Sequence, residues 1–520
     1  MLILVVDAAE ERRSRVAKRL AGRLGLPLVE GDELPPGPEP LASLSTPGAV
    51  LTGAAPPRTA ASPPLHLVRL AQGVSEAEQV ERAACELVRA GVIRGALRAS
   101  AQDAERPLTP AATEQLLDRL VESFGSPRRV LLLPPDATRA HSAAGELSVA
   151  LYRRLSPSAE VKLLPALGTH EPMSVSELEH MFPGIPRDRF LVHDFRSGVA
   201  TLGEVPGSFV SHVSAGKVDY PVPCQVAREI ASGGYDRIVS IGQLVPHEVI
   251  GIANHSKNVF VGTGGKESID RSHFLGAVCG MESMMGRAHT PVRDVLNYMS
   301  AELASELPLT YLCTVRKKDS AGLIQTHGLF AGDDEGCFLA GAPLVQQLNL
   351  DLVEQPLQNV VVYLDPHEFR TTWLGNKALY RTRMAIADGG TLTVLGPGVR
   401  RFGEDAGIDR LIRRHGYRGT EHTLAQVKRD PELAACLSAA AHLIHGSSEG
   451  RFRVRWAAGG LTPEEVRSVG YEWAEVGPLL ERYAPQKLQD GFNRLSDGEE
   501  IFFVSNPGLG LWAFREKFRA

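Results

Sequence analysis

A repeated unit of strand, polar loop and helix constrains the fold of this chain more than any other feature of its sequence. Between residues 130 and 266, four short apolar runs are each followed by a loop that contains charged or imidazole side chains. This alternation is typical of an α/β fold with a largely parallel sheet. The runs that we expect to form strands are residues 130–133, 161–164, 237–241 and 258–261.

The loops after these runs hold most of the candidate functional residues. Because ligands bind outside the carboxyl ends of strands in open α/β sheets, we expect the loops to converge on one crevice. A second α/β set begins near residue 340, with strands expected at 360–364 and 391–395. The crevice should then lie between two domains, where ligand sites are common. The four loops are residues 134–139, 168–172, 242–247 and 262–266.

The length of 520 residues predicts more than one folded domain. We assign residues 1–105 to an N-terminal extension with a small α/β module and a proline-rich linker, and residues 106–338 to an N-terminal catalytic domain. Residues 339–490 should form a C-terminal α/β domain. Residues 491–520 should form a C-terminal segment that packs back on the catalytic domain.

Local patterns predict several elements near the N-terminus. A strand is expected at residues 2–6, an amphipathic helix at 16–24, and a further helix after the capping-box pattern at 75–78. Thr109 and Pro110 are typical of an N-cap and the first turn of a helix, so that the main domain should begin close to them.

Composition and charge exclude several classes of protein. Hydrophobic residues make up 43% of the chain and charged residues 22%, which is typical of a globular enzyme. The 61 acidic and 56 basic residues are spread along the chain, so neither nucleic acid nor a membrane is expected as a partner. The opening MLILVVD is apolar for only six residues, too few for a signal peptide or a membrane span, which predicts a cytoplasmic protein. The six cysteines form no C-x-x-C pair and are expected to be reduced.

His247, Lys257 and His273 form the most informative group of residues. Alone, each has an ordinary explanation: a hydrogen-bonded loop histidine, a solvated lysine, and a histidine that caps a helix. Together with Gly168-Thr169-His170 and Asp136-x-x-Arg139, however, they occur in the order and at the separations found in the lactate racemase family. Over roughly residues 108–405 the chain therefore resembles that family.

This resemblance implies a cofactor and a reaction. The family uses a nickel-pincer nucleotide, pyridinium-3-thioamide-5-thiocarboxylic acid mononucleotide carrying Ni(II), which would be joined to Lys257. His273 would complete the square plane of the metal, a geometry that suits Ni(II). The chain would then be an isomerase, a racemase or epimerase of a 2-hydroxy acid acting by reversible hydride transfer. His170 and His247 would be its two acid/base catalysts, a role that suits the near-neutral pKa of histidine.

Four further residues are assigned to the site. Arg139 is expected to clamp the substrate carboxylate, the alternative being an ion pair with Asp136. Asp136 is expected at the cofactor, as an orienting carboxylate. Lys266 ends a glycine-rich loop whose N–H groups could hold the cofactor phosphate, although the loop fails as a Walker motif. Lys377, in Trp373-Leu-Gly-Asn-Lys377, would bind substrate or cofactor, the alternative being a surface lysine on a helix.

Two departures from the family leave the substrate open. Leu374 replaces a polar residue of lactate racemases, and residues 254–256 (Asn-His-Ser) replace their usual glycine and arginine run. The substrate could be a short aliphatic 2-hydroxy acid, a dicarboxylate such as malate, or a sugar acid. The other expected partners are the cofactor-synthesis enzymes of the lactate racemase system. His193 and His367, each with an arginine three positions later, are second-rank site candidates.

Two other functions remain possible from the sequence. Lys257 could carry pyridoxal phosphate as a Schiff base, but this leaves the spacing to His273 unexplained. The chain could instead be a nickel or nucleotide carrier without turnover. A carrier needs no acid/base pair, and His170 and His247 therefore favour the enzyme.

Overall fold

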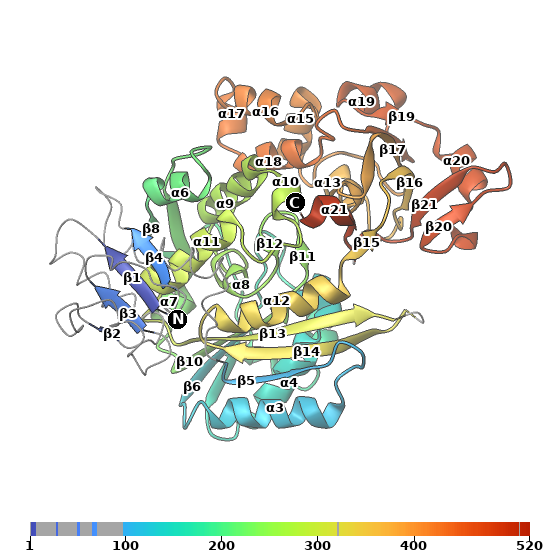
Figure 1. Cartoon of the computed structure of the whole chain (residues 1–520). Helices are drawn as coiled ribbons and strands as arrows, with labels where there is room; N and C mark the ends of the chain where they lie inside the picture. The colour runs from blue at the N-terminus through green and yellow to red at the C-terminus, as the bar shows by residue number, and fades with distance from the viewer. Residues whose placement is uncertain are drawn as a thin grey trace.

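The structure, a computed structural model, describes residues 97–319, 322–508 and 510–519, together with Glu78 and the backbone of four strands near the N-terminus (Figure 1). The predicted strand at Leu2–Val6 is confirmed, and it lies in a parallel sheet of order β2-β3-β1-β4. The helices predicted at 16–24 and after Ser75 lie outside the described residues. The four strands are β1 (Leu2–Val6), β2 (Leu28–Val29), β3 (Ala49–Thr52) and β4 (Leu65–Arg69).

The first large sheet has six strands in the order β5-β14-β13-β10-β6-β7. Neighbouring strands from β13 to β7 run parallel, while β14 is antiparallel to both β13 and β5. The strands predicted at 130–133, 161–164 and 237–241 are confirmed, with ends shifted by one or two residues. The strands are β5 (Ala99–Gln102), β6 (Arg129–Leu133), β7 (Glu160–Leu163), β10 (Arg237–Gln243), β13 (Leu309–Lys318) and β14 (Ile324–Gly332).

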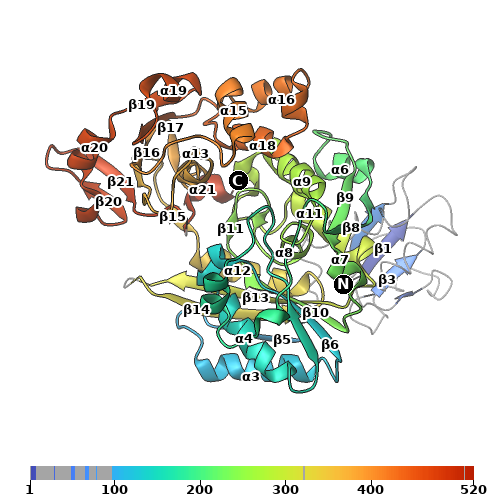
Figure 2. The same ribbon diagram turned by 180° about the vertical axis from the view of Figure 1, so that it is seen from behind.

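Alternate residues of β6 enter two different hydrophobic clusters, because successive side chains of a strand point to opposite faces. Val130 and Leu132 pack with helices α3 (Pro110–Glu122) and α4 (Ala144–Leu155), whereas Leu131 and Leu133 pack on the other face with the cluster that includes α11 and α12. Both views place α12 across the sheet from α3 and α4 (Figures 1 and 2). The run is apolar throughout because both faces of the sheet are covered.

The predicted cap of α3 is confirmed: the Thr109 hydroxyl accepts a hydrogen bond from the Ala112 N–H, and Pro110 begins the helix. The remaining elements of this half of the chain are helices, strands and turns. They are α5 (Val175–Met181), α6 (Gly207–Val213), α7 (Arg228–Ser232), α8 (Ser256–Phe260), α9 (Lys266–Cys279), α10 (Met281–Met284), α11 (Pro291–Tyr298), α12 (Gly336–Leu348), strands β8 (Val199–Val205), β9 (Val222–Ala227), β11 (Pro246–His247) and β12 (Gly251–Ile252), 3₁₀ turns η2 (Ala137–Ser142) and η3 (Arg187–Arg189), and a π turn η4 (Met299–Leu303).

The fourth predicted strand, at residues 258–261, is wrong. Residues 256–260 form the short helix α8 instead. A short apolar run fits a strand and a buried helix equally well by its pattern. Tertiary contacts decide for the helix, because the Asn258 amide donates to the Leu133 carbonyl and the Ser240 hydroxyl and fixes α8 under the ends of two strands.

The second large sheet has the order β19-β18-β17-β16-β21-β20 and is parallel except for the β20–β21 pair. Both strands predicted in this region are confirmed: the strand predicted at 360–364 overlaps β16 and ends one residue beyond it, and the strand predicted at 391–395 lies within β17. The elements are β16 (Leu357–Tyr363), β17 (Ile386–Gly396), β18 (Arg453–Ala458), β19 (Glu472–Trp473), β20 (Gly491–Arg494), β21 (Glu500–Val504), α13 (Thr372–Gly375), α14 (Lys377–Thr382), α15 (Ala406–His415), α16 (Thr420–Val427), α17 (Pro431–Ala434), α18 (Leu437–His445), α19 (Pro463–Ser468), α20 (Val476–Tyr483) and η5 (Pro485–Lys487). The chain therefore has an α/β fold with two largely parallel sheets.

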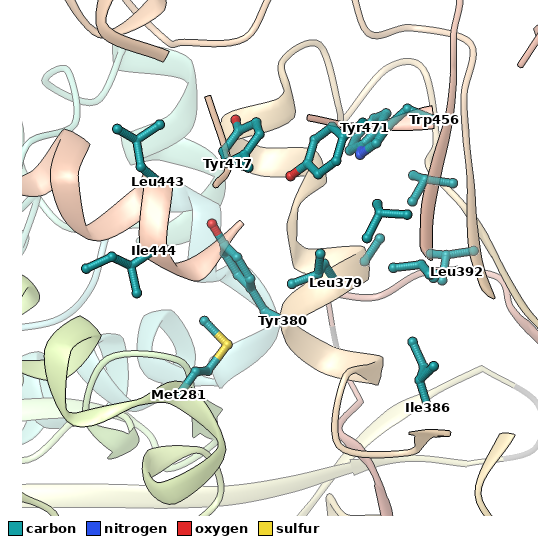
Figure 3. Packing of buried hydrophobic residues seen from close by; sticks show 14 of the residues in the cluster. Met281, Leu379, Tyr380, Ile386, Leu392, Tyr417, Leu443, Ile444, Trp456 and Tyr471 are labelled. Atoms are coloured by element: carbon teal, nitrogen blue, oxygen red, sulfur yellow. The ribbon is translucent and has the colours of Figure 1, made fainter. Parts of the chain in front are cut away.

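The two halves share a hydrophobic cluster. Met281 of α10 lies beside Tyr380 of α14 and Ile444 of α18, and α18 packs along α9 (Figure 3). The two halves therefore meet in a packed apolar interface, and rotation of one half against the other would expose buried surface.

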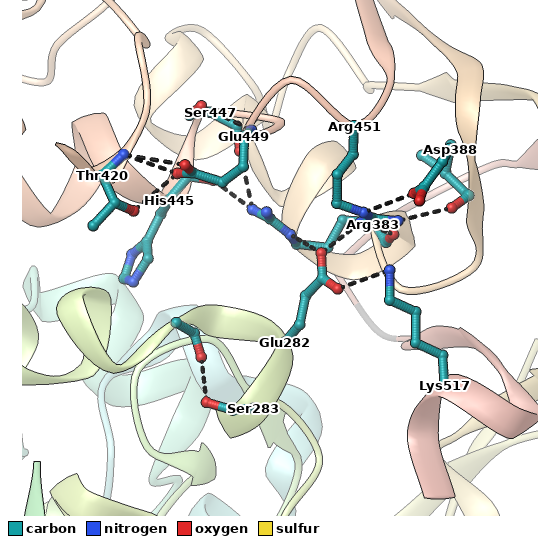
Figure 4. A network of polar contacts seen from close by, with 12 residues as sticks. Glu282, Ser283, Arg383, Asp388, Thr420, His445, Ser447, Glu449, Arg451 and Lys517 are labelled. Carbon is teal, nitrogen blue, oxygen red and sulfur yellow. Dashed lines mark hydrogen bonds and ion pairs between the residues drawn. The ribbon is translucent and has the colours of Figure 1, made fainter. Parts of the chain in front are cut away.

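A single carboxylate adds polar contacts to this interface (Figure 4). Glu282 of α10 pairs with Arg383 at 3.1 Å, with Arg451 at 2.5 Å and with Lys517 at 3.1 Å. Lys517 belongs to the final helix α21 (Arg515–Arg519), which follows strand β22 (Trp512–Phe514), the partner of β15 (Asp351–Val353).

Across the helices that the structure describes, none combines the length and the apolar character needed to span a bilayer.

Candidate active site

The adjacent parallel strands β10, β6 and β7 bring three of the predicted loops to one edge of the first sheet. The loops also touch one another, because the Gly168 N–H donates to the Gly262 carbonyl at 2.8 Å. The fourth loop reaches this edge from the end of α8 rather than from a strand. Three strands and one helix thus position the four predicted loops.

His170 and Asp136 are in direct contact. His170 Nδ1 lies 2.6 Å from Asp136 Oδ2, and the Thr138 hydroxyl donates to Asp136 Oδ1 at 2.5 Å. Burial alone would raise the pKa of Asp136, but the hydrogen bonds from His170 and Thr138 outweigh it and hold this pKa below its ordinary value. Asp136 is buried, whereas half of the His170 side chain is exposed. The ring can therefore meet a ligand while its other nitrogen is held.

Arg139 is exposed and lies next to this pair. It donates to the Thr138 hydroxyl at 2.9 Å, and among the described residues it makes no ion pair with Asp136. Burial is the main cause of the lowered pKa values of Lys257 and Lys377, and the charge of Arg139 lowers both further. We call Asp136, Arg139 and His170 the exposed side of the site.

His247 lies in a more enclosed environment at the end of β11. Its Nδ1 accepts a hydrogen bond from the Val249 N–H at 3.1 Å, and the Glu248 carboxylate is 4.0 Å from the same nitrogen. Burial holds the pKa of His247 well below its ordinary value, although Glu248 acts in the opposite direction. The charges of Lys257, His273 and Arg381 also lower the pKa of His247.

Arg381 connects the second domain to this histidine. From α14 it donates to the Pro246 carbonyl at 2.7 Å and approaches Glu248 at 4.0 Å. Burial alone would raise the pKa of Glu248, but the charges of His247 and Arg381 hold it below its ordinary value. We call His247, Glu248 and Arg381 the buried side of the site.

Lys257 is in the first turn of α8, after two residues with left-handed backbone, Asn254 (φ 66°) and His255 (φ 57°). Arg293 holds this turn by donating to the Asn254 carbonyl, the Ser256 hydroxyl and, at 2.6 Å, the Ile252 carbonyl. A Cβ added to Gly242 would lie 1.9 Å from the Asn254 amide nitrogen. The strained turn is therefore fixed from two directions.

Burial, with a smaller effect from the charge of Arg139, lowers the pKa of Lys257 to about 8. At pH 7 roughly a tenth of such a lysine is a neutral, nucleophilic amine. No hydrogen bond or ion pair holds its Nζ among the residues that the structure describes. Lys257 is thus chemically suited to carry a covalently bound group.

His273, on α9, presents one free nitrogen. Its Nδ1 lies 2.7 Å from the Ile269 carbonyl, which can only accept, so Nδ1 carries the proton and Nε2 keeps its lone pair. Burial, assisted by the charge of Lys257, lowers its pKa and favours the neutral ring. A neutral imidazole with a fixed tautomer is a suitable metal ligand. In the described part of the chain, no three His, Cys, Asp or Glu residues are grouped to bind a metal ion by themselves.

The two remaining lysines differ in their surroundings. Lys266 is exposed and pairs with Asp270, one turn further along α9. Lys377 begins α14 and is largely covered, and burial, together with the charge of Arg139, lowers its pKa. The structure brings Lys377 into the charged surroundings of Glu248 and Arg139, whereas it engages Lys266 in a helix-surface ion pair. Phosphate binding by Lys266 stays a prediction.

Sequence reasoning missed Glu248, Arg381 and Arg293. Two of them carried a usable signal: Glu248 directly follows His247, and Arg381 lies one helical turn after Lys377, which places both on the same face of a helix. Arg293 had no signal, because its acceptors are main-chain carbonyls and a hydroxyl 37 or more positions away.

The second-rank histidines have different surroundings. His193 is buried, and its Nε2 lies 3.0 Å from the Gly264 carbonyl, so it supports the glycine-rich loop. His367 is exposed. A separate surface pocket of about 490 Å³ lies between α15 and α17 and is lined by Arg414, Arg418 and His422 among others. Its carboxylate Asp430 already pairs with Arg414, and the candidate active-site residues do not line it.

Comparison with known proteins adds independent information. Residues 90–286 match the lactate racemase N-terminal domain family. A crystal structure of a Thermotoga maritima protein superposes with a TM-score of 0.66 at 24% identity, covering 80% of this chain and 100% of that one. The lactate racemase apoprotein from Thermoanaerobacterium thermosaccharolyticum superposes with a TM-score of 0.58 at 16% identity, covering 77% of this chain and 92% of that one.

No curated protein gives a significant sequence match. The two structural likenesses show a shared fold, and the family match covers the segments that contain His170, His247, Lys257 and His273. Residues 90–286 are therefore similar to the lactate racemase N-terminal domain family, and the chain shares its fold with the lactate racemase apoprotein.

Proposed function

We propose that the chain is a racemase or epimerase of a 2-hydroxy acid, with a nickel-pincer nucleotide attached to Lys257. One observation carries the proposal: His273 is held through Nδ1 by the Ile269 carbonyl and leaves Nε2 free to bind a metal. The half-buried Lys257, whose pKa is lowered to about 8, is near enough for its charge to help lower the pKa of His273. The family match at residues 90–286 supports the class of reaction.

The residues present fit the cofactor. Lys257 would hold it covalently, and His273 Nε2 would supply one nitrogen ligand to Ni(II), for which a single protein donor is enough when the cofactor supplies the others. When bound, the cofactor supplies the hydride acceptor. A pyridoxal Schiff base on Lys257 would give the free nitrogen of His273 no role.

Substrate binding falls to the cations. Arg139 and Lys377 would hold the carboxylate, because both are cationic and their charges act on one another. His170 and His247 would exchange the hydroxyl proton, each from its own side of the substrate. Asp136 would orient His170 through the bond at Nδ1.

Intact mass and metal analysis test the proposal. The chain, expressed together with the cofactor-synthesis enzymes, should gain the mass of the nucleotide and one nickel, and should invert one member of a panel of lactate, malate and sugar acids. Lys257→Ala should abolish the mass gain, whereas the matched control Lys266→Ala should retain it. An unmodified Lys257 in the wild-type protein would contradict the cofactor, and a loaded protein that inverts none of the acids would favour a carrier.

A further inference from the structure

The two histidines at the candidate site carry their protons on different nitrogens. Each has a hydrogen bond at Nδ1, but the partners are of opposite kinds: a carboxylate at His170 and a backbone N–H at His247. A neutral imidazole has one N–H and one lone pair, so the partner at Nδ1 decides what Nε2 offers to a ligand.

For His170, the partner is an acceptor. Asp136 is held ionised at neutral pH, and its Oδ1 already accepts from Thr138. An ionised carboxylate has no proton to donate, so the 2.6 Å contact requires the proton to be on His170 Nδ1. When this ring is neutral, its Nε2 therefore has a lone pair and can accept a proton.

For His247, the partner is a donor. The Val249 N–H can only donate, so Nδ1 of His247 must have its lone pair and the ring cannot be doubly protonated. The single proton of the ring is then on Nε2. Glu248, 4.0 Å away, is too far to accept a hydrogen bond from Nδ1 in this arrangement.

We propose that the resting protein is asymmetric: His170 is the proton acceptor, and His247 is a neutral hydrogen-bond donor through Nε2–H. This inference rests on the proposed function and refines it. The protein is then prepared for the enantiomer whose hydroxyl group faces His170. That O–H bond breaks, its proton joins His170 Nε2, its electron pair forms the C=O bond, and the Cα hydrogen leaves with its electrons to the hydride acceptor.

The opposite enantiomer needs a different state of His247. To accept a proton at Nε2, His247 must first move its own proton to Nδ1, which breaks the bond from Val249 and turns Nδ1–H towards Glu248. Glu248 is the only carboxylate within 4.0 Å of this ring among the described residues. Glu248 is thus a positioning residue for the less populated state, as Asp136 is for the resting one.

Nitrogen NMR of the protein without cofactor tests the asymmetry directly. In a [¹⁵N]histidine-labelled sample, two-bond proton–nitrogen correlations distinguish Nδ1–H from Nε2–H rings, and His170→Gln and His247→Gln assign the two signals by their loss. We expect His170 as the Nδ1–H form and His247 as the Nε2–H form. Asp136→Asn should disturb only His170. The same tautomer in both rings, or a mixture at His247, would overturn the inference.

A kinetic test uses the loaded protein. Glutamine retains an N–H donor but is not a base, so His247→Gln should form keto acid in a single turnover from one enantiomer within about tenfold of the wild-type rate. From the other enantiomer the loss should be at least about 10²-fold. Equal losses for both enantiomers would contradict the asymmetry. The NMR result needs no cofactor, so failure of the proposed function and failure of this inference are distinguishable.

Discussion

The exposed and buried sides of the candidate site hold a histidine in two different ways. His170 is half exposed, and a single carboxylate from its own domain orients it. His247 is enclosed, and an arginine from the other domain fixes its loop through the Pro246 carbonyl. The comparison teaches that solvent can reach one histidine directly, while the other depends on the packing of the two halves of the molecule.

The substitution with the largest expected effect is on the exposed side of the site. Asp136→Asn removes the charge that fixes the His170 tautomer. The value of kcat should therefore fall about 10³-fold, a loss of the kind found in other enzymes when the carboxylate that orients a catalytic histidine is replaced. Steady-state kinetics of the loaded enzyme measure it. The melting temperature should change little, and a variant with full activity would show that His170 needs no orienting group.

A substitution on the buried side of the site should lower the free energy of unfolding. Arg381→Met leaves Glu248 without its cation and the Pro246 carbonyl without its donor, which should lower the free energy of unfolding by about 3 kcal/mol. Arg139→Met, the matched change on the exposed side, should cost less than about 0.5 kcal/mol. Denaturant titration compares the two variants. Equal costs would remove the distinction between the sides.

Acid should destabilise the packed interface behind the buried side. Burial, with a smaller effect from His445, lowers the pKa of His442 to about 3, and burial likewise lowers the pKa of His445 to about 3. Between about pH 6.5 and pH 3 the unfolded chain binds protons that the folded chain does not, so stability falls as pH falls through this window. At pH 5 each histidine should cost about 2 kcal/mol relative to pH 8.

His445→Gln provides the control for this pH dependence. The variant loses one titrating group, so its unfolding free energy should decrease less between pH 8 and pH 5 than that of the wild-type protein. Thermal melts at both pH values measure the difference. An unchanged pH dependence would mean that His445 takes up its proton without unfolding.

The smallest effect concerns the exposed arginine. Arg139→Lys keeps the charge but loses the planar fork, so KM should rise about tenfold with kcat nearly unchanged. Initial rates over a range of substrate concentrations separate the two constants. A fall in kcat instead would place Arg139 at the reacting atoms rather than at the substrate carboxylate.

Much of the fold was predictable from the periodicity of the sequence, because strands covered on both faces leave clear apolar runs. The exception, residues 256–260, shows the limit of this reasoning: hydrogen bonds from Asn258 to two strands decide for a helix, and neither partner is close in sequence. Arg381 was missed for a similar reason, since its acceptor is a carbonyl 135 positions earlier. The roles of His170, His247, Lys257 and His273 came from a family resemblance rather than from spacing.

Gly242 limits how this protein can be redesigned. Any side chain there would collide with the Asn254 amide, and Asn254 begins the left-handed turn that delivers Lys257. A mutant library aimed at new substrates should therefore leave position 242 constant and vary Leu374, which precedes Lys377 in the other domain. A side chain at position 242 would have to displace the Asn254 amide and would disturb the turn that carries Lys257.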